Sequence, residues 1–259
     1  MAQETLIIKA NSPEIKLPPT QDELPYDDGI PMESQRHVLQ MHLLINPLSQ
    51  WLKTQKREAF VGGNMFVYFS LNQVRNEDYR GPDVFVVLDV PRRERKSWVV
   101  WEEEKAPDVV IELLSQSTAK KDKEEKKLVY QNRLRVTEYF WYDPFQPEDF
   151  VGHRLEGGIY KTLAPDFQGR FSSEILNLLL VRWQGIYGDE QEPITWLRWA
   201  TSEGKLLPTA DELAQQERVR AEQERVRAEQ AVQELGQEKQ RAERLAAQLR
   251  ALGVEIDDS

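Results

Sequence analysis

Apolar residues recur at helical spacing over residues 32–55, which predicts a helix. Pro47 lies within this segment and predicts a kink or a break, because proline lacks the backbone N–H group that a helix interior uses. Residues 58–70 change to a two-residue alternation, with Gly62 and Gly63 near the start. This second pattern predicts a hairpin-like β segment with a turn or bulge at the glycines.

Two later segments are apolar at nearly every position, as expected of strands that are covered on both faces. They are residues 82–90, PDVFVVLDV, and residues 108–115, DVVIELLS. We expect a short edge strand between them at 97–103. A lysine-rich helix over about 121–133 and a strand over 136–142 follow, which makes a β-α-β unit with parallel strands. The predicted fold class is therefore α/β, with a mixed central sheet flanked by helices.

The rest of the globular region continues with β structure. Residues 150–155 and 159–163 are separated by Glu-Gly-Gly and predict a hairpin. Residues 171–207 are apolar and rich in tryptophan, which predicts a buried segment that closes the core.

The composition changes at about Thr209 to a long, highly charged segment in which QERVRAE occurs twice in tandem. A column of mostly alanine residues recurs every seven positions. A solvated single helix with charge pairs and a weak coiled coil explain this pattern equally well. Three parts are expected: an extended N-terminal arm at 1–30, a globular domain at 31–207 and a C-terminal helix at 208–259, which is a candidate coiled coil.

The composition also excludes several classes of function. The chain has 259 residues and 40% hydrophobic residues, which is enough for a core. It has no cysteine, which excludes disulfides, thiolate zinc sites and cysteine nucleophiles and fits the reducing cytoplasm. Neither a signal peptide nor an apolar run of membrane-spanning length is recognisable, so we expect a soluble, cytoplasmic protein without a membrane partner.

Acidic residues dominate the charge along the whole chain. The net charge is −10; residues 209–259 hold 8 basic and 12 acidic residues, a net −4, which leaves −6 for the rest. A protein that coats a nucleic-acid duplex would be basic. Any contact with nucleic acid must therefore be made by a local patch.

Two carboxylates are placed where a metal ion could bind. Glu112 stands inside an apolar strand, where a buried carboxylate needs a cation, a metal ion or a raised pKa. Asp83 opens the other apolar strand. If the two strands are neighbours, the carboxylates meet at a strand spacing of about 5 Å, which suits a divalent metal with oxygen ligands. Asp108 points to the same face as Glu112 but lies about 13 Å away along the strand.

The lysine-rich helix supplies further polar groups. Asp122, Lys126 and Tyr130 follow one another at intervals of four residues and lie on roughly one face. An ammonium group near a metal-bound water lowers the pKa of that water and stabilises charge on a phosphate. The alternative interpretation of the Lys/Glu run is a solvated surface. We expect Tyr130 to pack against the sheet and Asp122 to pair with Lys126.

Five motifs in a fixed order connect these residues to a known family: PDVFVV, PDVVIELLSQST, D-x-x-x-K-x-x-x-Y, VTEYFWYDP and HRLEGGIY. Together they resemble the Uma2 family of bacterial endonucleases, in the PD-(D/E)xK restriction-endonuclease-like superfamily, over about residues 33–180. The resemblance implies a restriction-endonuclease-like core. It also implies hydrolysis of DNA phosphodiester bonds by a water molecule that Mg²⁺ or Mn²⁺ activates.

The resemblance implies a role for four residues. Asp83 and Glu112 are expected to be metal ligands, Lys126 the catalytic lysine, and Glu33 an acidic residue that the first helix presents. The superfamily has a lysine two residues after the glutamate, where this chain has Leu114. The resemblance implies that the following helix supplies the lysine instead.

The sequence leaves three alternatives open. Lys126 has the expected spacing, but Lys127 is adjacent and Lys123 is nearly one turn earlier. His37, one turn after Glu33, is interpreted as an ordinary core or surface histidine. The alternative to a DNA endonuclease is an inactive nuclease-fold module that acts in binding or assembly through its C-terminal helix. A homodimer could form through the globular domain or through that helix.

Overall fold

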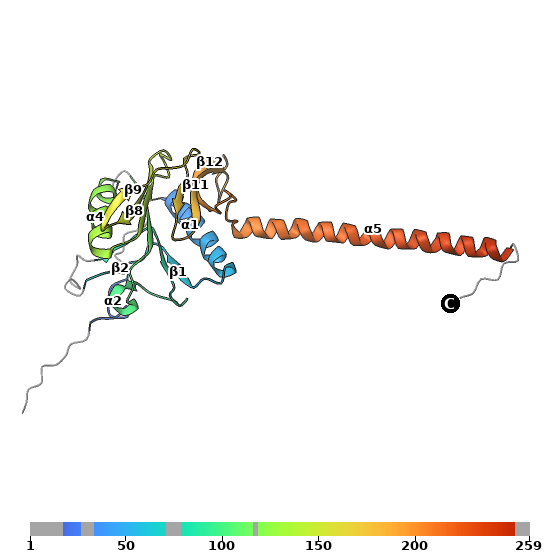
Figure 1. Ribbon diagram of the computed structural model, residues 1–259, viewed down its shortest axis with the longest axis horizontal. Helices are drawn as coiled ribbons and strands as arrows, with labels where there is room; N and C mark the ends of the chain where they lie inside the picture. The colour runs from blue at the N-terminus through green and yellow to red at the C-terminus, as the bar shows by residue number, and fades with distance from the viewer. Residues whose placement is uncertain (1–17, 27–33, 71–78, 116–118, 252–259) are drawn as a thin grey trace, which may run out of the picture. The chain divides into compact units, whose positions relative to one another are not determined.

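The computed structural model describes residues 18–26, 34–70, 79–115 and 119–251 (Figure 1). Glu33, one of the four predicted site residues, lies outside these ranges. Within them, no helix has both the length and the apolar character of a membrane span. The chain divides into two compact units, Met1–Leu207 and Pro208–Ser259.

A six-stranded mixed sheet forms the centre of the first unit. Its strands are β1 (Ala59–Gly62), β4 (Val84–Leu88), β6 (Val109–Leu113), β7 (Glu138–Tyr142), β8 (Phe150–Glu156) and β9 (Ile159–Thr162). Their order in the sheet is β1-β4-β6-β7-β8-β9. β6 and β7 are parallel, and all other neighbours are antiparallel. The predicted α/β class, the mixed sheet and the β-α-β unit are therefore confirmed.

The sheet is buried on both faces, as its continuous apolar strands predict. Val84 and Ile111 belong to one core, and Phe85 and Val110 belong to another on the opposite face. The first core includes residues of α1 (Gln35–Thr54) and of a three-stranded antiparallel sheet. Figure 1 shows α1 with this smaller sheet on one side of the central sheet and α4 on the other. The strands of the smaller sheet are β10 (Phe171–Ser173), β11 (Leu178–Gly185) and β12 (Ile194–Ala200).

A helical segment over residues 119–134, called here the crossover helix, connects β6 to β7. It consists of α3 (Ala119–Lys121), η2 (Asp122–Lys126), α4 (Lys127–Val129) and η3 (Tyr130–Leu134). The helix is found where it was predicted, but η2 and η3 are π-helical. Such wide turns are rare in helices and occur often at functional sites.

The predicted break at Pro47 is not found, because α1 continues through the proline without interruption. Ser34 caps the helix and accepts a hydrogen bond from the backbone N–H of His37. Leu44 and Leu48, on either side of the proline, are completely buried. Their burial outweighs the backbone hydrogen bond that proline removes, since tertiary packing supplies most of the stability of such a helix.

The predicted hairpin within residues 58–70 is wrong. β1 pairs with β4, and the next strand belongs to a separate sheet. At Gly63 the chain passes directly against the backbone of Asp83, and a Cβ atom there would collide with the Asp83 carbonyl oxygen. After β1 the chain thus continues against the segment that leads into β4, where the N–H of Asn64 donates to the carbonyl of Pro82.

The third sheet contains β2 (Val67–Tyr68), β3 (Tyr79–Arg80) and β5 (Trp98–Val99). The edge strand expected at 97–103 is shorter than predicted, because the short helix α2 (Val100–Glu103) follows β5 directly. Residues 18–26 pack beside this sheet, where the indole N–H of Trp101 donates to the carbonyl of Pro19.

The remaining predictions for secondary structure are confirmed. β8 and β9 form the expected hairpin, and Gly157 and Gly158 adopt positive φ angles in its turn. The closing segment was predicted as buried, and it forms β10, β11 and β12. The second unit contains one long helix, α5 (Ala210–Ala251), in which Arg220 and Glu224 form an ion pair one turn apart. Association of two such helices stays a prediction.

Candidate active site

β4 and β6 place Asp83 and Glu112 opposite each other. The antiparallel register pairs Val84 with Ile111, and its continuation by one residue pairs Asp83 with Glu112. Because side chains alternate along a strand, both carboxylates point away from the α1 core and towards the crossover helix. The backbone N–H of Leu113 donates to Asp83 Oδ2 at 2.7 Å. The two strands are therefore neighbours, which was the condition for the two carboxylates to meet.

The crossover helix brings three polar side chains to this point. Lys126 Nζ lies 3.0 Å from Glu112 Oε2 and 2.7 Å from Asp122 Oδ1. The Tyr130 hydroxyl donates to Glu112 Oε1 at 2.6 Å. Glu112 is completely buried, so hydrogen bonds replace water at both of its oxygens. The expected pairing of Asp122 with Lys126 is confirmed.

Burial sets the protonation behaviour of the cluster. It raises the pKa of Glu112 to about 7, and the charge of Asp83 acts in the same direction, against Lys126 and the Tyr130 hydroxyl. Burial also raises the pKa of Asp83, although Lys126 opposes this. For Lys126, burial favours the neutral amine, but the carboxylates of Glu112, Asp122 and Asp83 outweigh it and raise the pKa. The lysine is therefore charged at neutral pH.

The charges in the cluster suit a divalent cation. Three carboxylates, Asp83, Glu112 and Asp122, against one ammonium leave a net charge of −2 when all four groups are ionised. Within the described ranges, no group of three or more histidine, aspartate and glutamate side chains is arranged as a metal site. Asp83 and Glu112 could thus provide two oxygen ligands, with water and a substrate phosphate as the others, as is common for Mg²⁺.

The two neighbouring lysines contact other groups. Lys123 forms an ion pair with Asp149. Lys127 lies over the ring of Trp141, with Nζ 5.9 Å from the centroid, and burial lowers its pKa. Of the three lysines that the sequence left open, Lys126 is the one that the structure places against Glu112.

The Uma2 family, described as "Putative restriction endonuclease", matches residues 15–181 of this chain. The chain belongs to the Uma2 family. This confirms the resemblance seen in the motifs and agrees with the restriction-endonuclease-like sheet described above. The match includes α1, β4, β6, the crossover helix and β7, and therefore all described residues of the carboxylate cluster. No curated protein matches the chain in a sequence comparison.

Three other residues that the sequence analysis discussed have contacts that stabilise the fold and lie outside the carboxylate cluster. His37 is buried, with Nδ1 2.8 Å from Ser34 Oγ and Nε2 3.1 Å from the carbonyl oxygen of Leu114. It is a core histidine that joins α1 to the end of β6. The side chain of Leu114 lies in the core beneath the crossover helix. Asp108, at the far end of β6, accepts a hydrogen bond from the backbone of Leu88.

Tyr130 has a role that the sequence analysis did not predict. Its ring packs against Tyr139 as expected, with the ring centroids 5.2 Å apart. Its hydroxyl, however, binds the carboxylate of Glu112. The four-residue interval from Lys126 put both side chains on one face, but a sequence does not show how far a phenol hydroxyl reaches.

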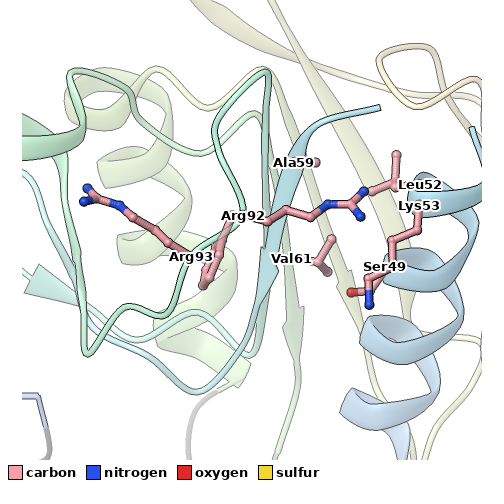
Figure 2. A pocket seen from close by; sticks show the side chains of 8 residues that line it. Ser49, Leu52, Lys53, Ala59, Val61, Arg92 and Arg93 are labelled. Carbon is pink, nitrogen blue, oxygen red and sulfur yellow. The ribbon is translucent and has the colours of Figure 1, made fainter. Parts of the chain in front are cut away.

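A pocket of about 180 Å³ lies away from the carboxylate cluster (Figure 2). Figure 2 shows the Arg92 side chain reaching towards Leu52 and Lys53, whereas Arg93 points away. Arg92 donates to the carbonyl of Arg57, three residues after α1 ends, and Arg93 forms an ion pair with Glu103. Both arginines of the pocket therefore have partners within the protein. The lining residues are Ser49, Leu52, Lys53, Ala59, Phe60, Val61, Arg92 and Arg93.

Proposed function

We propose that this Uma2 protein is a divalent-metal-dependent endonuclease that hydrolyses DNA phosphodiester bonds. The main support is the convergence of Asp83, Glu112 and Lys126 from two strands and a helix. A completely buried carboxylate with a pKa raised to about 7 is costly for stability and is typical of functional sites. The family match supports the same reaction class.

Each residue of the cluster has a role in this proposal. Asp83 and Glu112 would hold Mg²⁺ or Mn²⁺, and Tyr130 would fix the orientation of the Glu112 carboxylate through its hydroxyl. The ion, when bound, lowers the pKa of a coordinated water so that it can attack phosphorus. The Lys126 ammonium would stabilise the charge that develops on the phosphate.

The exposure of Lys126 supports this role. Its side chain is 15% exposed, whereas those of Glu112 and Asp122 are 0% and 1% exposed. Lys126 is thus the most exposed side chain of this ion-paired group. Asp122 would hold it in place between catalytic events, as a positioning residue.

Cleavage of plasmid DNA and of labelled DNA and RNA oligonucleotides, with Mg²⁺ or Mn²⁺, tests the proposal. We expect Glu112→Ala and Lys126→Ala to lower the cleavage rate at least about 100-fold. Asp108→Asn is the matched control, because it changes a carboxylate of the same strand outside the cluster, and it should keep wild-type activity. Equal rates in all four proteins would contradict the proposal. Absence of cleavage by the wild type would favour a non-catalytic module.

A further inference from the structure

Phe145 presents an ordered aromatic ring to solvent. It lies in the loop between β7 and β8, and 54% of its surface is exposed. Prolines flank the short segment at positions 144 and 147. The Asp143 carboxylate accepts hydrogen bonds from the backbone N–H groups of Phe145, at 2.7 Å, and Gln146, at 3.0 Å. The loop thus fixes the backbone from which the exposed ring projects.

A cation lies over this ring. The guanidinium carbon of Arg36 is 4.7 Å from the Phe145 centroid, and the ring of His37 is 5.7 Å away. In the part of the chain that the structure describes, Arg36 has no acidic partner. Among the described residues, the pair therefore combines an aromatic face with a positive charge that no carboxylate neutralises.

The ring lies at the same edge of the sheet as the carboxylate cluster. β6 and β7 are parallel, so the loop after β7 lies at the edge where β6 ends, one residue after Glu112. His37 binds the carbonyl of Leu114 and also contacts Phe145. These two contacts, together with the rise per residue of a strand, place the Phe145 ring within roughly 20 Å of the Glu112 backbone. At the other end of the loop, Asp149 pairs with Lys123 of the crossover helix.

We propose that Phe145 and Arg36 form a stacking subsite for an unpaired base of the nucleic acid that the carboxylate cluster cleaves. Aromatic rings stack on any base, and a guanidinium pairs with the adjacent phosphate. Bases within a duplex are already stacked and paired, so they cannot use the ring without being extruded. The subsite therefore selects single-stranded or locally unpaired substrates. This inference rests on the proposed nuclease function.

An exposed phenylalanine alone would not support this conclusion, because single apolar residues are common on protein surfaces. Phe167 is the internal comparison. It is 93% exposed, in the turn between β9 and β10, and within the described residues it has no ring or cation contact. The fixed loop, the cation and the position at the same edge of the sheet as the carboxylate cluster distinguish Phe145 from Phe167.

Binding in EDTA, where a metal-dependent enzyme does not cleave, tests the subsite. The probes are a single strand that contains 2-aminopurine and the same strand in a perfect duplex. Phe145→Ala should weaken single-strand binding roughly 5- to 150-fold and abolish the stacking-induced quenching of 2-aminopurine. Duplex binding should change less than about two-fold. Phe145→Trp should keep both signals, and Phe167→Ala should behave as wild type.

The outcomes separate this inference from the proposed function. If the wild type cleaves nucleic acid but Phe145→Ala and Phe167→Ala bind single strands equally well, the subsite is wrong and the nuclease function stands. If single-strand binding depends on Phe145 but no cleavage occurs with any metal, the nuclease function is wrong, and Phe145 stands as a stacking site for single strands that are bound without cleavage. Equal loss of single-strand and duplex binding in Phe145→Ala, or no single-strand binding by the wild type, would also overturn the subsite.

Discussion

The Lys126 ammonium lies 3.0 Å from the Glu112 carboxylate, although a sequence separation of 14 residues and a change from strand to helix lie between them. Leu114 occupies the strand position where the superfamily motif has its lysine. In this chain the crossover helix delivers the ammonium to the carboxylate. The position of that helix on the sheet therefore decides whether the cluster has an ammonium group beside its carboxylates.

The first prediction separates the three lysines of the crossover helix. Lys126→Ala should lower kcat about 100- to 1,000-fold, because it removes the ammonium that contacts Glu112. Lys123→Ala and Lys127→Ala should lower it less than about ten-fold, since these side chains contact Asp149 and Trp141. Single-turnover cleavage assays measure the rate of the chemical step in each variant. A larger loss in either control than in Lys126→Ala would contradict the assignment.

The second prediction concerns stability and pH. The pKa of Glu112 is about 7 in the folded protein against an ordinary value of 4.5, so the folded state binds more protons between these pH values. The contribution of Glu112 to the free energy of unfolding therefore falls as the pH rises from about 4.5 to 7, by up to about 3 kcal/mol. Glu112→Gln should remove this contribution to the pH dependence of the free energy of unfolding.

Urea unfolding at pH 5 and pH 8 in EDTA measures the effect. The comparison with Glu112→Gln is needed because burial lowers the pKa of His153 from 6.5 to about 4, which changes the stability in the opposite direction over this range. Asp83, whose pKa burial also raises, should contribute with the same sign as Glu112. Identical pH slopes in the wild type and Glu112→Gln would show that Glu112 does not titrate as described.

The third prediction concerns metal binding. Calorimetry should detect Mn²⁺ or Mg²⁺ binding that is lost in Asp83→Asn and Glu112→Gln and kept in Asp108→Asn. Affinity should fall as the pH is lowered through 7, because the metal needs the ionised form of Glu112. At a metal concentration 100 times the Kd, the bound ion should stabilise the wild type by about 2.7 kcal/mol. Binding that survives both substitutions would place the metal elsewhere.

The fourth prediction concerns Tyr130. Tyr130→Phe removes the hydroxyl that donates to Glu112 and leaves the ring in its core. We expect metal affinity to fall about 10- to 100-fold, since the hydrogen bond orients a proposed ligand. The pKa of Glu112 should rise further, because the hydroxyl stabilises the ionised form. Tyr160→Phe is the control, as its hydroxyl binds the carbonyl of Val136 instead.

The fifth prediction concerns α5. Deleting residues 208–259 removes one compact unit and should lower the mass in light scattering from a dimer to a monomer. Leu235→Glu should have the same effect, because Leu235 is exposed and continues the column of Ala221 and Ala228. Val232→Glu changes an exposed residue outside this column and serves as the control. If the deletion lowers the mass only by that of the removed residues and leaves the oligomeric state unchanged, α5 is a solvated helix.

The two apolar strand segments around Asp83 and Glu112 were predictable for a physical reason, whereas their pairing was only a condition of the hypothesis. Strands covered on both faces are apolar at nearly every position, so a carboxylate within one is conspicuous. The parallel β6–β7 pair followed from the helix between them. The pairing of β1 with β4 was not predictable, because contacts between distant strands depend on tertiary packing.

Other features of the site could not be predicted from the sequence, because they depend on the folded structure. The π-helical turns of the crossover helix leave no clear pattern in a lysine-rich sequence. The hydrogen bond from Tyr130 and the stacking of Arg36 on Phe145 depend on side-chain reach and on contacts between distant segments. The sequence therefore predicted which residue types gather at this edge but left the choice among three lysines open.

Asp83 is constrained on two sides before any ligand arrives. Gly63 lies against its carbonyl oxygen, and the N–H of Leu113 holds one carboxylate oxygen. The conformational entropy of this side chain is therefore lost during folding and not during metal binding. Ordering of Asp83 should accordingly contribute little to the entropy of metal binding. Any side chain at position 63 would displace the backbone of Asp83 and so weaken metal binding, although residue 63 itself is not a proposed ligand.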